Sequence, residues 1–107
     1  MILIAHRGNT KGPVPSKENH PDYILDCLSE GYHCEVDVWY GTDEGFLLGH
    51  DEPKFKVTSD FLMNEKLFCH AKSIAALDEM LYKGIHCFWH EGDRVALTSR
   101  GFVWKYP

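Results

Sequence analysis

The sequence predicts an α/β fold in which parallel strands are joined through helices. Apolar, strand-like segments alternate with two amphipathic helical segments, and glycine- or proline-containing turns separate them. Consecutive parallel strands need a crossover connection, which a helix supplies. Only two helices are predicted in 107 residues, whereas a closed TIM barrel needs about 250. We therefore expect a TIM-barrel-like architecture that is shortened or represented by its N-terminal half.

Local patterns define the elements of the first half of the chain. Pro21 fits the first turn of a helix, where its missing N–H has no partner to lose, and Gly31 is typical of a helix end. The apolar stripe predicted for the buried face of this helix is Ile24, Leu25 and Leu28. In chain order we expect a strand over residues 2–5, a loop over 8–17, a helix over 19–31, a strand over 32–40, a turn at 43–45 and a strand over 46–48.

The second half repeats this alternation after a polar connection. Ser73 is the expected N-cap of a second helix, and Gly84 is its expected end. The predicted buried face of this helix is Ile74, Leu77 and Leu81. Further strands are expected over residues 67–71, 85–89, 95–98 and 102–104.

Composition excludes several classes of function. The chain has 11 Lys and Arg against 16 Asp and Glu, a formal net charge of −5, so no basic face for nucleic acid is expected. No apolar stretch reaches the roughly 20 residues that cross a bilayer, and the run at residues 2–5 is too short for a signal-peptide core. Four cysteines lie singly in apolar segments, which favours reduced, buried thiols and a cytoplasmic protein. They are Cys27, Cys34, Cys69 and Cys87.

The most informative segment is the predicted strand around Glu35 and Asp37. Because strand side chains alternate between faces, both carboxylates lie on one side, about 7 Å apart. Their apolar neighbours face the other side, and these are Cys34, Val36 and Val38. Two anions in one cavity repel and are costly to desolvate unless a cation joins them, so a divalent metal ion is one interpretation. The other is an exposed edge strand with both acids in water.

A histidine and an arginine follow the first strand. His6 lies at the carboxyl end of that strand, where ligands collect in parallel α/β sheets. An imidazole there suits proton transfer near neutral pH. Arg7 can bind a phosphate through two parallel hydrogen bonds. The alternative is a surface His–Arg pair at the start of a loop.

Two later segments are expected near the same edge. His50 follows the strand after the turn, and Asp51 either orients its imidazole or is only a turn residue. His70 and Lys72 share a face at the end of the next strand. Lys72 is then an ammonium group at a phosphate or a solvated lysine before a helix. Two further histidines are interpreted as core or rim residues: His86 and His90.

Together, four short motifs resemble those of the glycerophosphodiester phosphodiesterase family, part of the phosphatidylinositol-phospholipase-C-like barrel superfamily. Each motif is weak alone, but the four occur in the family's order and at family-like spacing. The resemblance is firm over residues 2–51, looser through Lys72 and general beyond it. The motifs are Ala5-His6-Arg7-Gly8, Glu18-Asn19, Glu35-Val36-Asp37 and Gly49-His50-Asp51.

The length of the chain allows one domain, over residues 1–107. The resemblance implies a phosphoric diester hydrolase of lipid metabolism that acts on a small phosphodiester. It also implies a divalent cation, Mg²⁺ or Ca²⁺. We assign the base to His6 and the acid to His50, and expect Lys72 to neutralise charge on the phosphate. The implied roles are cation binding by Glu35 and Asp37, acid–base catalysis by His6 and His50, phosphate binding by Arg7, and orientation of Arg7 or substrate contact by Glu18.

The chain departs from the family pattern at two points. The family normally has an acidic metal ligand two residues before the lysine, but that position here is His70. An imidazole can bind a metal, and it favours a transition metal over calcium. The family also continues through further barrel strands, so we expect an incomplete barrel that a second copy of the chain could complete.

Two other functions stay open. One is a lyase-type phospholipase that acts on an inositol or choline lipid by internal attack and releases a cyclic phosphate. The other is an inactive barrel fragment that binds a partner or assembles with copies of itself. Open sheet edges with unpaired backbone groups and exposed apolar surface favour the second alternative.

Overall fold

The computed structural model describes residues 3–105, and these form an α/β protein. The predicted α/β class is therefore confirmed. In chain order the elements are β1 (Ile4–His6), α1 (Pro21–Ser29), β2 (His33–Gly41), β3 (Gly45–Leu48), β4 (Phe55–Val57), α2 (Ser59–Leu62), β5 (Leu67–Ala71), α3 (Ile74–Lys83), β6 (Cys87–Phe88), β7 (Val95–Leu97) and β8 (Val103–Lys105).

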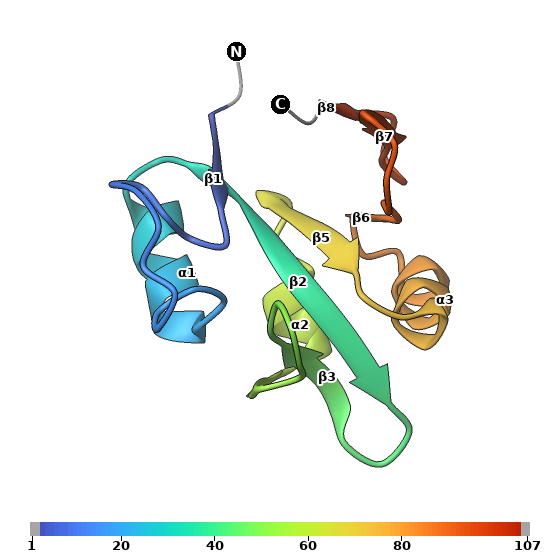
Figure 1. Cartoon of the computed structure of the whole chain (residues 1–107). Helices are drawn as coiled ribbons and strands as arrows, with labels where there is room; N and C mark the ends of the chain where they lie inside the picture. Colours follow the sequence, from blue (N-terminus) through green and yellow to red (C-terminus); the bar gives the residue numbers. More distant parts are fainter. Residues whose placement is uncertain (1–2, 106–107) are drawn as a thin grey trace.

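Six strands form one mixed sheet (Figure 1). β1, β2, β5 and β6 are parallel and lie side by side in chain order. β3 pairs antiparallel with the second half of β2, on the edge whose first half pairs with β1, and β4 extends this part of the sheet. Over residues 3–105 the sheet stays open, so the barrel expected from the sequence is not closed by this segment.

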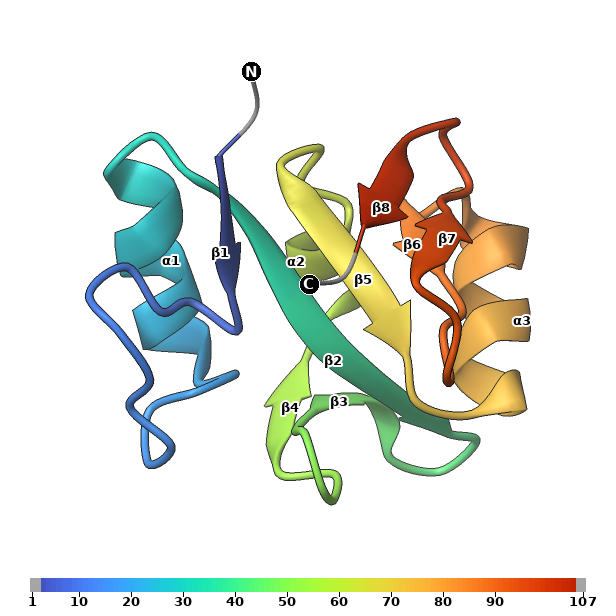
Figure 2. The same ribbon diagram turned by 45° about the horizontal axis from the view of Figure 1, so that its top comes forward.

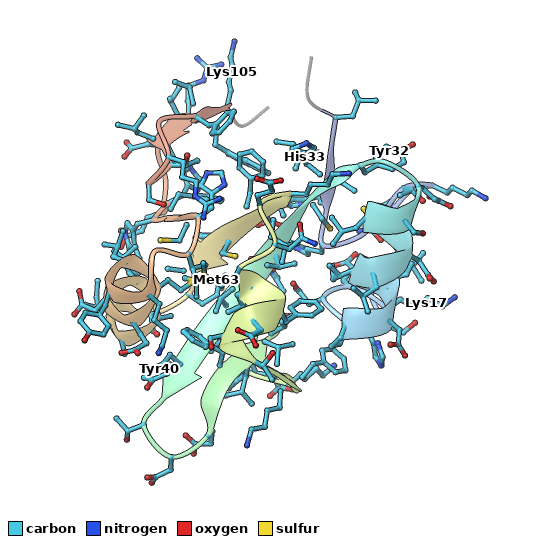
Figure 3. The ribbon with its side chains drawn as sticks, turned by 180° about the vertical axis from the view of Figure 1, so that it is seen from behind. Lys17, Tyr32, His33, Tyr40, Met63 and Lys105 are labelled. Carbon is cyan, nitrogen blue, oxygen red and sulfur yellow. The ribbon has the colours of Figure 1, made fainter. Side chains whose placement is uncertain are left out.

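All three helices pack against one face of the sheet, which Figure 3 shows from behind. The strand alternation predicted for β2 is confirmed on this face, where its three apolar side chains are fully buried. Leu62 of α2 joins the same core. The three buried apolar side chains of β2 are Cys34, Val36 and Val38.

The opposite face carries the β7–β8 hairpin, a separate two-stranded sheet (Figure 2). Trp104 stacks on Phe88 of β6, with ring centroids 5.2 Å apart, and its ring lies 5.7 Å from that of Phe68 in β5. Ala96 of β7 is buried in the same cluster. The two strands predicted near these positions therefore exist, but they shield the apolar part of this face instead of extending the main sheet.

The buried face of α3 differs from the predicted stripe. Ile74 and Leu81 are 59% and 52% exposed, and Leu77 is only partly buried. The helix instead docks through Ala76 and Met80, which are fully buried. A small side chain and a flexible one let the helix approach the sheet closely, whereas the apolar spacing could not distinguish the two faces. The predicted caps are confirmed, since the side chain at position 73 accepts from the third helical N–H and the glycine at 84 is left-handed.

The prediction for α1 is correct in part. Ile24 is buried and Leu28 packs against the core, but Leu25 is half-exposed. The helix begins with Pro21 as expected, and the side chain of His20 accepts a hydrogen bond from the first turn.

The connection between β3 and β5, expected as a polar connection, contains two short elements. β4 pairs with β3, and α2 begins after Thr58, whose hydroxyl accepts the N–H of Phe61. The strand expected over 85–89 is reduced to two residues, and β1 begins at Ile4. The expected start of that strand at residue 2 lies outside the described residues.

The cysteines agree with the sequence prediction. All four are buried free thiols. Burial raises the pKa of each thiol, which keeps the sulfur protonated and unreactive. Over residues 3–105, helices that combine the length and apolar character needed to cross a membrane are absent.

His86 gives a testable pH dependence of stability. Its side chain is 1% exposed, and its Nε2 lies 2.7 Å from the hydroxyl of Thr98 at the end of β7. Burial lowers the pKa of this imidazole, and the nearby charge of Arg100 lowers it further. Since the unfolded pKa is about 6.5, the unfolded chain binds the proton first as the pH falls. This contribution to stability is therefore present above about pH 6.5 and is lost below it.

The measurement is urea unfolding between pH 5 and 8 for the wild type and for His86→Asn. The stability difference between the two proteins should shrink as the pH falls, because only the wild type carries this titration. Two curves that stay parallel would contradict the assignment.

Candidate functional site

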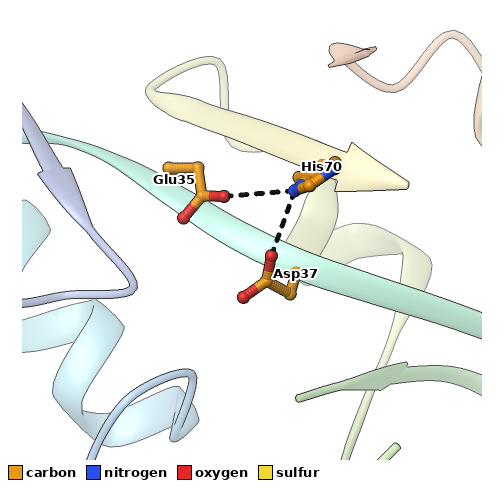
Figure 4. A group of neighbouring side chains, drawn as sticks. All are labelled: Glu35, Asp37 and His70. Carbon is orange, nitrogen blue, oxygen red and sulfur yellow. Dashed lines mark ion pairs between the residues drawn. The ribbon is translucent and has the colours of Figure 1, made fainter. Parts of the chain in front are cut away.

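Two buried carboxylates form the centre of the site. Glu35 and Asp37 in β2 are each 1% exposed, which rules out the exposed edge strand that the sequence also allowed. Both face Nδ1 of His70 at the end of the neighbouring β5, at 3.6 Å from Glu35 Oε2 and 3.2 Å from Asp37 Oδ1 (Figure 4). Parallel pairing of Asp37 with His70 explains why residues from distant segments share this face.

These three side chains fit a divalent cation. One ligand atom from each lies within 4.8 Å of the other two. Glu35 Oε1 and Asp37 Oδ1 are buried, yet they accept no hydrogen bond from the described residues. A buried carboxylate oxygen without a donor is costly, and a cation would relieve that cost. Two carboxylates and an imidazole suit first-row transition metals, since all three donors bind them.

The electrostatics of the cluster reflect burial of opposite charges. Burial acts to lower the pKa of His70, but its ion pairs with Asp37 and Glu35 outweigh this and raise the pKa to about 9. Burial raises the pKa of Glu35, and the neighbouring Asp37 charge adds to that rise. Burial would also raise the pKa of Asp37, but His70, Asn19 and Arg7 hold it well below its usual range. The cation-free cluster thus keeps a proton on the imidazole, and a metal ion would displace that proton.

Arg7 holds the site together rather than lying free for a ligand. Its guanidinium contacts three protein groups: Glu18 Oε1 at 3.0 Å, Asp37 Oδ2 at 3.3 Å and His50 Nε2 at 3.3 Å. The expected orientation of Arg7 by Glu18 is therefore present. A guanidinium has five N–H donors, so these contacts leave two of them uncommitted. Its φ of +55° is uncommon for a residue with a side chain, and the tight turn after β1 imposes it.

The two hydrogen-bond partners of the His50 imidazole define its tautomer. Arg7 can only donate, so His50 Nε2 must accept from it. Nδ1 then carries the proton and donates it to Asp37 Oδ2, 3.2 Å away. In this arrangement the Arg7 N–H engages the Nε2 lone pair of His50. The side chain of His6 is about half exposed, and its Nε2 lies 3.5 Å from Glu35 Oε1.

A cavity of about 390 Å³ opens over this cluster at the carboxyl ends of the parallel strands. A second cavity of about 440 Å³ adjoins it and shares Arg7 and His50 with it. Glu18 lines the second cavity. The first cavity is lined by His6, Arg7, Glu35, His50, His70, Lys72, His90 and Glu91.

The structure therefore brings together every side chain that the sequence singled out for catalysis or binding. His86 is a core residue, and His90 lies at the rim, as interpreted. Asn19 belongs to the Glu18-Asn19 motif, but its hydrogen bonds to Asp37 were not predicted from the sequence. Sequence reasoning also missed Trp39, whose indole N–H donates to the carbonyl of Gly49 at 2.7 Å and fixes the loop before His50. The strand alternation of β2 gives no signal for a bond to a loop.

Fold and site together define a small α/β protein with a buried acidic–histidine cluster at the carboxyl ends of its parallel strands. Comparison with protein-family models, with curated proteins and with solved structures finds no match to this chain.

Proposed function

We propose that this chain is a metal-dependent phosphodiesterase that cleaves a glycerophosphodiester or a related phosphodiester. One observation carries the proposal: a candidate cation site, two histidines at hydrogen-bonding positions, an arginine and a lysine surround one cavity. Cation, proton-transfer groups and positive charge are the parts that phosphodiester hydrolysis needs.

Glu35, Asp37 and His70 would hold the divalent cation. When bound, such a cation polarises a phosphoryl oxygen and neutralises its charge. The imidazole favours a transition metal over Ca²⁺ or Mg²⁺, because carboxylate oxygens alone would suit those hard cations better.

From the tautomer of His50 we propose proton-transfer roles opposite to those assigned from the sequence. Once a bound phosphoryl group takes over the Arg7 N–H, the Nε2 lone pair of His50 can take the proton of the attacking water, which would make His50 the base. His6 then supplies the proton to the leaving alcohol oxygen as the bond between phosphorus and that oxygen breaks. Glu35 Oε1 lies 3.5 Å from His6 Nε2, the nitrogen that would carry this proton.

Arg7 and Lys72 would bind the phosphoryl oxygens. The two uncommitted N–H groups of Arg7 are donors beside His50, and Lys72 lines the same cavity. The adjoining cavity next to Arg7 and His50 gives room for one alcohol substituent of the ester. The ligand is thus a small-molecule phosphodiester.

We also propose that the four parallel strands correspond to the first half of a TIM-type barrel. Their order β1-β2-β5-β6 follows the chain, as in such a barrel. The β3–β4 pair is then an insertion after the second parallel strand.

The test is hydrolysis of glycerophosphocholine by the purified chain, with Mn²⁺, with Mg²⁺ and with a chelator. We expect choline or phosphocholine to be released with metal and not with chelator, and His50→Ala to be inactive. A cyclic glycerophosphate product would indicate the lyase alternative. Equal rates for all samples would contradict the enzymatic function.

A second candidate, assembly with another copy of the chain, is favoured by the outer face of the β7–β8 hairpin. Val95, Leu97 and Val103 there are 50%, 71% and 68% exposed. Exposed apolar patches often mark interaction surfaces. Measuring the mass in solution of the assayed sample separates the candidates, because an active sample with the mass of one chain excludes a need for assembly.

A further inference from the structure

Asn19 is an unusual residue for its place in the chain. It lies just before α1, is completely buried and has a φ of +67°, a left-handed conformation that asparagine tolerates better than most residues. Its side-chain amide makes two hydrogen bonds to one residue. Nδ2 donates to Asp37 Oδ2, and Oδ1 accepts the backbone N–H of Asp37, both at 2.9 Å.

The two oxygens of Asp37 have different surroundings. Oδ2 lies beside three nitrogens from three segments: Asn19 Nδ2 at 2.9 Å, His50 Nδ1 at 3.2 Å and Arg7 Nε at 3.3 Å. Oδ1 faces only His70 Nδ1 at 3.2 Å and accepts no hydrogen bond from the described residues. Protein groups thus position the Asp37 carboxylate through Oδ2, and Oδ1 faces the candidate cation site.

We propose that Asn19 is a positioning residue that selects which oxygen of Asp37 faces the cation site. Through Oδ2 it also fixes the oxygen to which His50 and Arg7 are aligned. This inference rests on the proposed function, because it takes Glu35, Asp37 and His70 as the cation ligands.

The chemistry of the amide explains the choice of residue. The planar amide of asparagine or glutamine carries a donor and an acceptor side by side, and asparagine reaches both groups from a left-handed backbone. An aspartate would place a second carboxylate 2.9 Å from Asp37 Oδ2. A glycine would keep the backbone conformation and lose both bonds. The backbone N–H of Asn19 also donates to the carbonyl of Arg7, which anchors this loop to the end of β1.

The test uses Co²⁺ alone as the probe, with affinity and visible absorption spectrum as readouts. Asn19→Gly should bind Co²⁺ about 10- to 100-fold more weakly, the range seen when groups that orient metal ligands are removed. Its Co²⁺ spectrum should change, because the Asp37 oxygen no longer has a fixed orientation. A loss of stability alone would lower the folded fraction without changing the spectrum of the folded protein.

Tyr23→Phe is the matched control. It removes the hydrogen bond from the Tyr23 hydroxyl to Asn9 in the same loop, and that bond does not involve Asp37. This variant should keep the wild-type Co²⁺ affinity and spectrum. Urea unfolding of each metal-free variant measures its folded fraction.

Asn19→Asp provides a second test, since it keeps an acceptor for the Asp37 N–H. We expect weaker Co²⁺ binding because the new carboxylate turns Asp37 away. Stronger binding would show a simple effect of added negative charge and would overturn the proposal.

The outcomes separate this inference from the proposed function. A wild-type protein that fails to bind Co²⁺, Mn²⁺ or Mg²⁺ contradicts the cation site itself. A wild type that binds, with Asn19→Gly unchanged in affinity and spectrum, overturns only the role of Asn19. Equal losses in Asn19→Gly and Tyr23→Phe would also overturn it, because general loosening of the loop would then suffice.

Discussion

Asp37→Asn should lower the rate of phosphodiester hydrolysis by about a thousand-fold or more, the size of effect typical for loss of charge stabilisation combined with loss of acid–base alignment. The substitution keeps the size of the side chain and removes its charge. Asp37 is a candidate cation ligand through Oδ1 and holds His50 and Arg7 through Oδ2. One substitution therefore disturbs the cation, the base and the phosphate-binding arginine together.

The same variant should also lose stability. Removing one partner of a buried ion pair leaves the other uncompensated and typically costs about 3–5 kcal/mol. Here the guanidinium of Arg7 and the protonated imidazole of His70 would lose the carboxylate between them. Urea unfolding of metal-free protein measures this loss, and steady-state assays at saturating metal measure the rate.

Asp43→Asn is the control for these measurements. Asp43 lies in the exposed turn between β2 and β3, so its loss of charge should change neither the rate nor the stability appreciably. A rate within about tenfold of wild type for Asp37→Asn would contradict the role of Asp37, because a single acid–base contribution alone exceeds that.

His6→Ala and His50→Ala should respond differently to the leaving group. Each should slow the hydrolysis of an alkyl phosphodiester by about 10²- to 10⁴-fold, the usual contribution of a general acid or base. A p-nitrophenyl ester has a leaving group that needs no protonation. His6→Ala should therefore recover most of its rate with that ester, whereas His50→Ala should not.

This comparison decides the direction of proton transfer. The contacts of His50 with Arg7 on one nitrogen and Asp37 on the other are the reason that we propose His50 as the base. If His50→Ala recovered with the p-nitrophenyl ester and His6→Ala did not, the roles inferred from the sequence would be right. Recovery of neither variant would mean that the two histidines do not divide the proton transfer in this way.

Much of the site could be predicted because it depends on strand periodicity. Glu35 and Asp37 are two residues apart in one strand, and His70 and Lys72 are two apart in the next. Alternation alone places each pair on one face. The register of a parallel pair then puts Asp37 beside His70, which explains why the structure brings these residues together as expected.

The parts that the sequence missed depend on contacts between distant segments. The buried face of α3 is set by Ala76 and Met80 against the sheet, although Ile74 and Leu81 give an equally regular apolar pattern. The place of the β7–β8 hairpin is set by Trp104 stacking on Phe88. Neither choice has a local signal, because both depend on which surfaces meet.

The sequence by itself determined most of the elements, the caps of α3 and the strand faces that carry the acids and His70, since these follow from local periodicity and backbone preference. Only the tertiary structure decided that Arg7 contacts Glu18, Asp37 and His50. It alone also decided that His50 carries its proton on Nδ1 and that the Asn19 side chain hydrogen-bonds to Asp37. The reason is physical: a hydrogen bond between residues 11 to 43 positions apart depends on how the chain folds back, and residue order does not encode that distance directly.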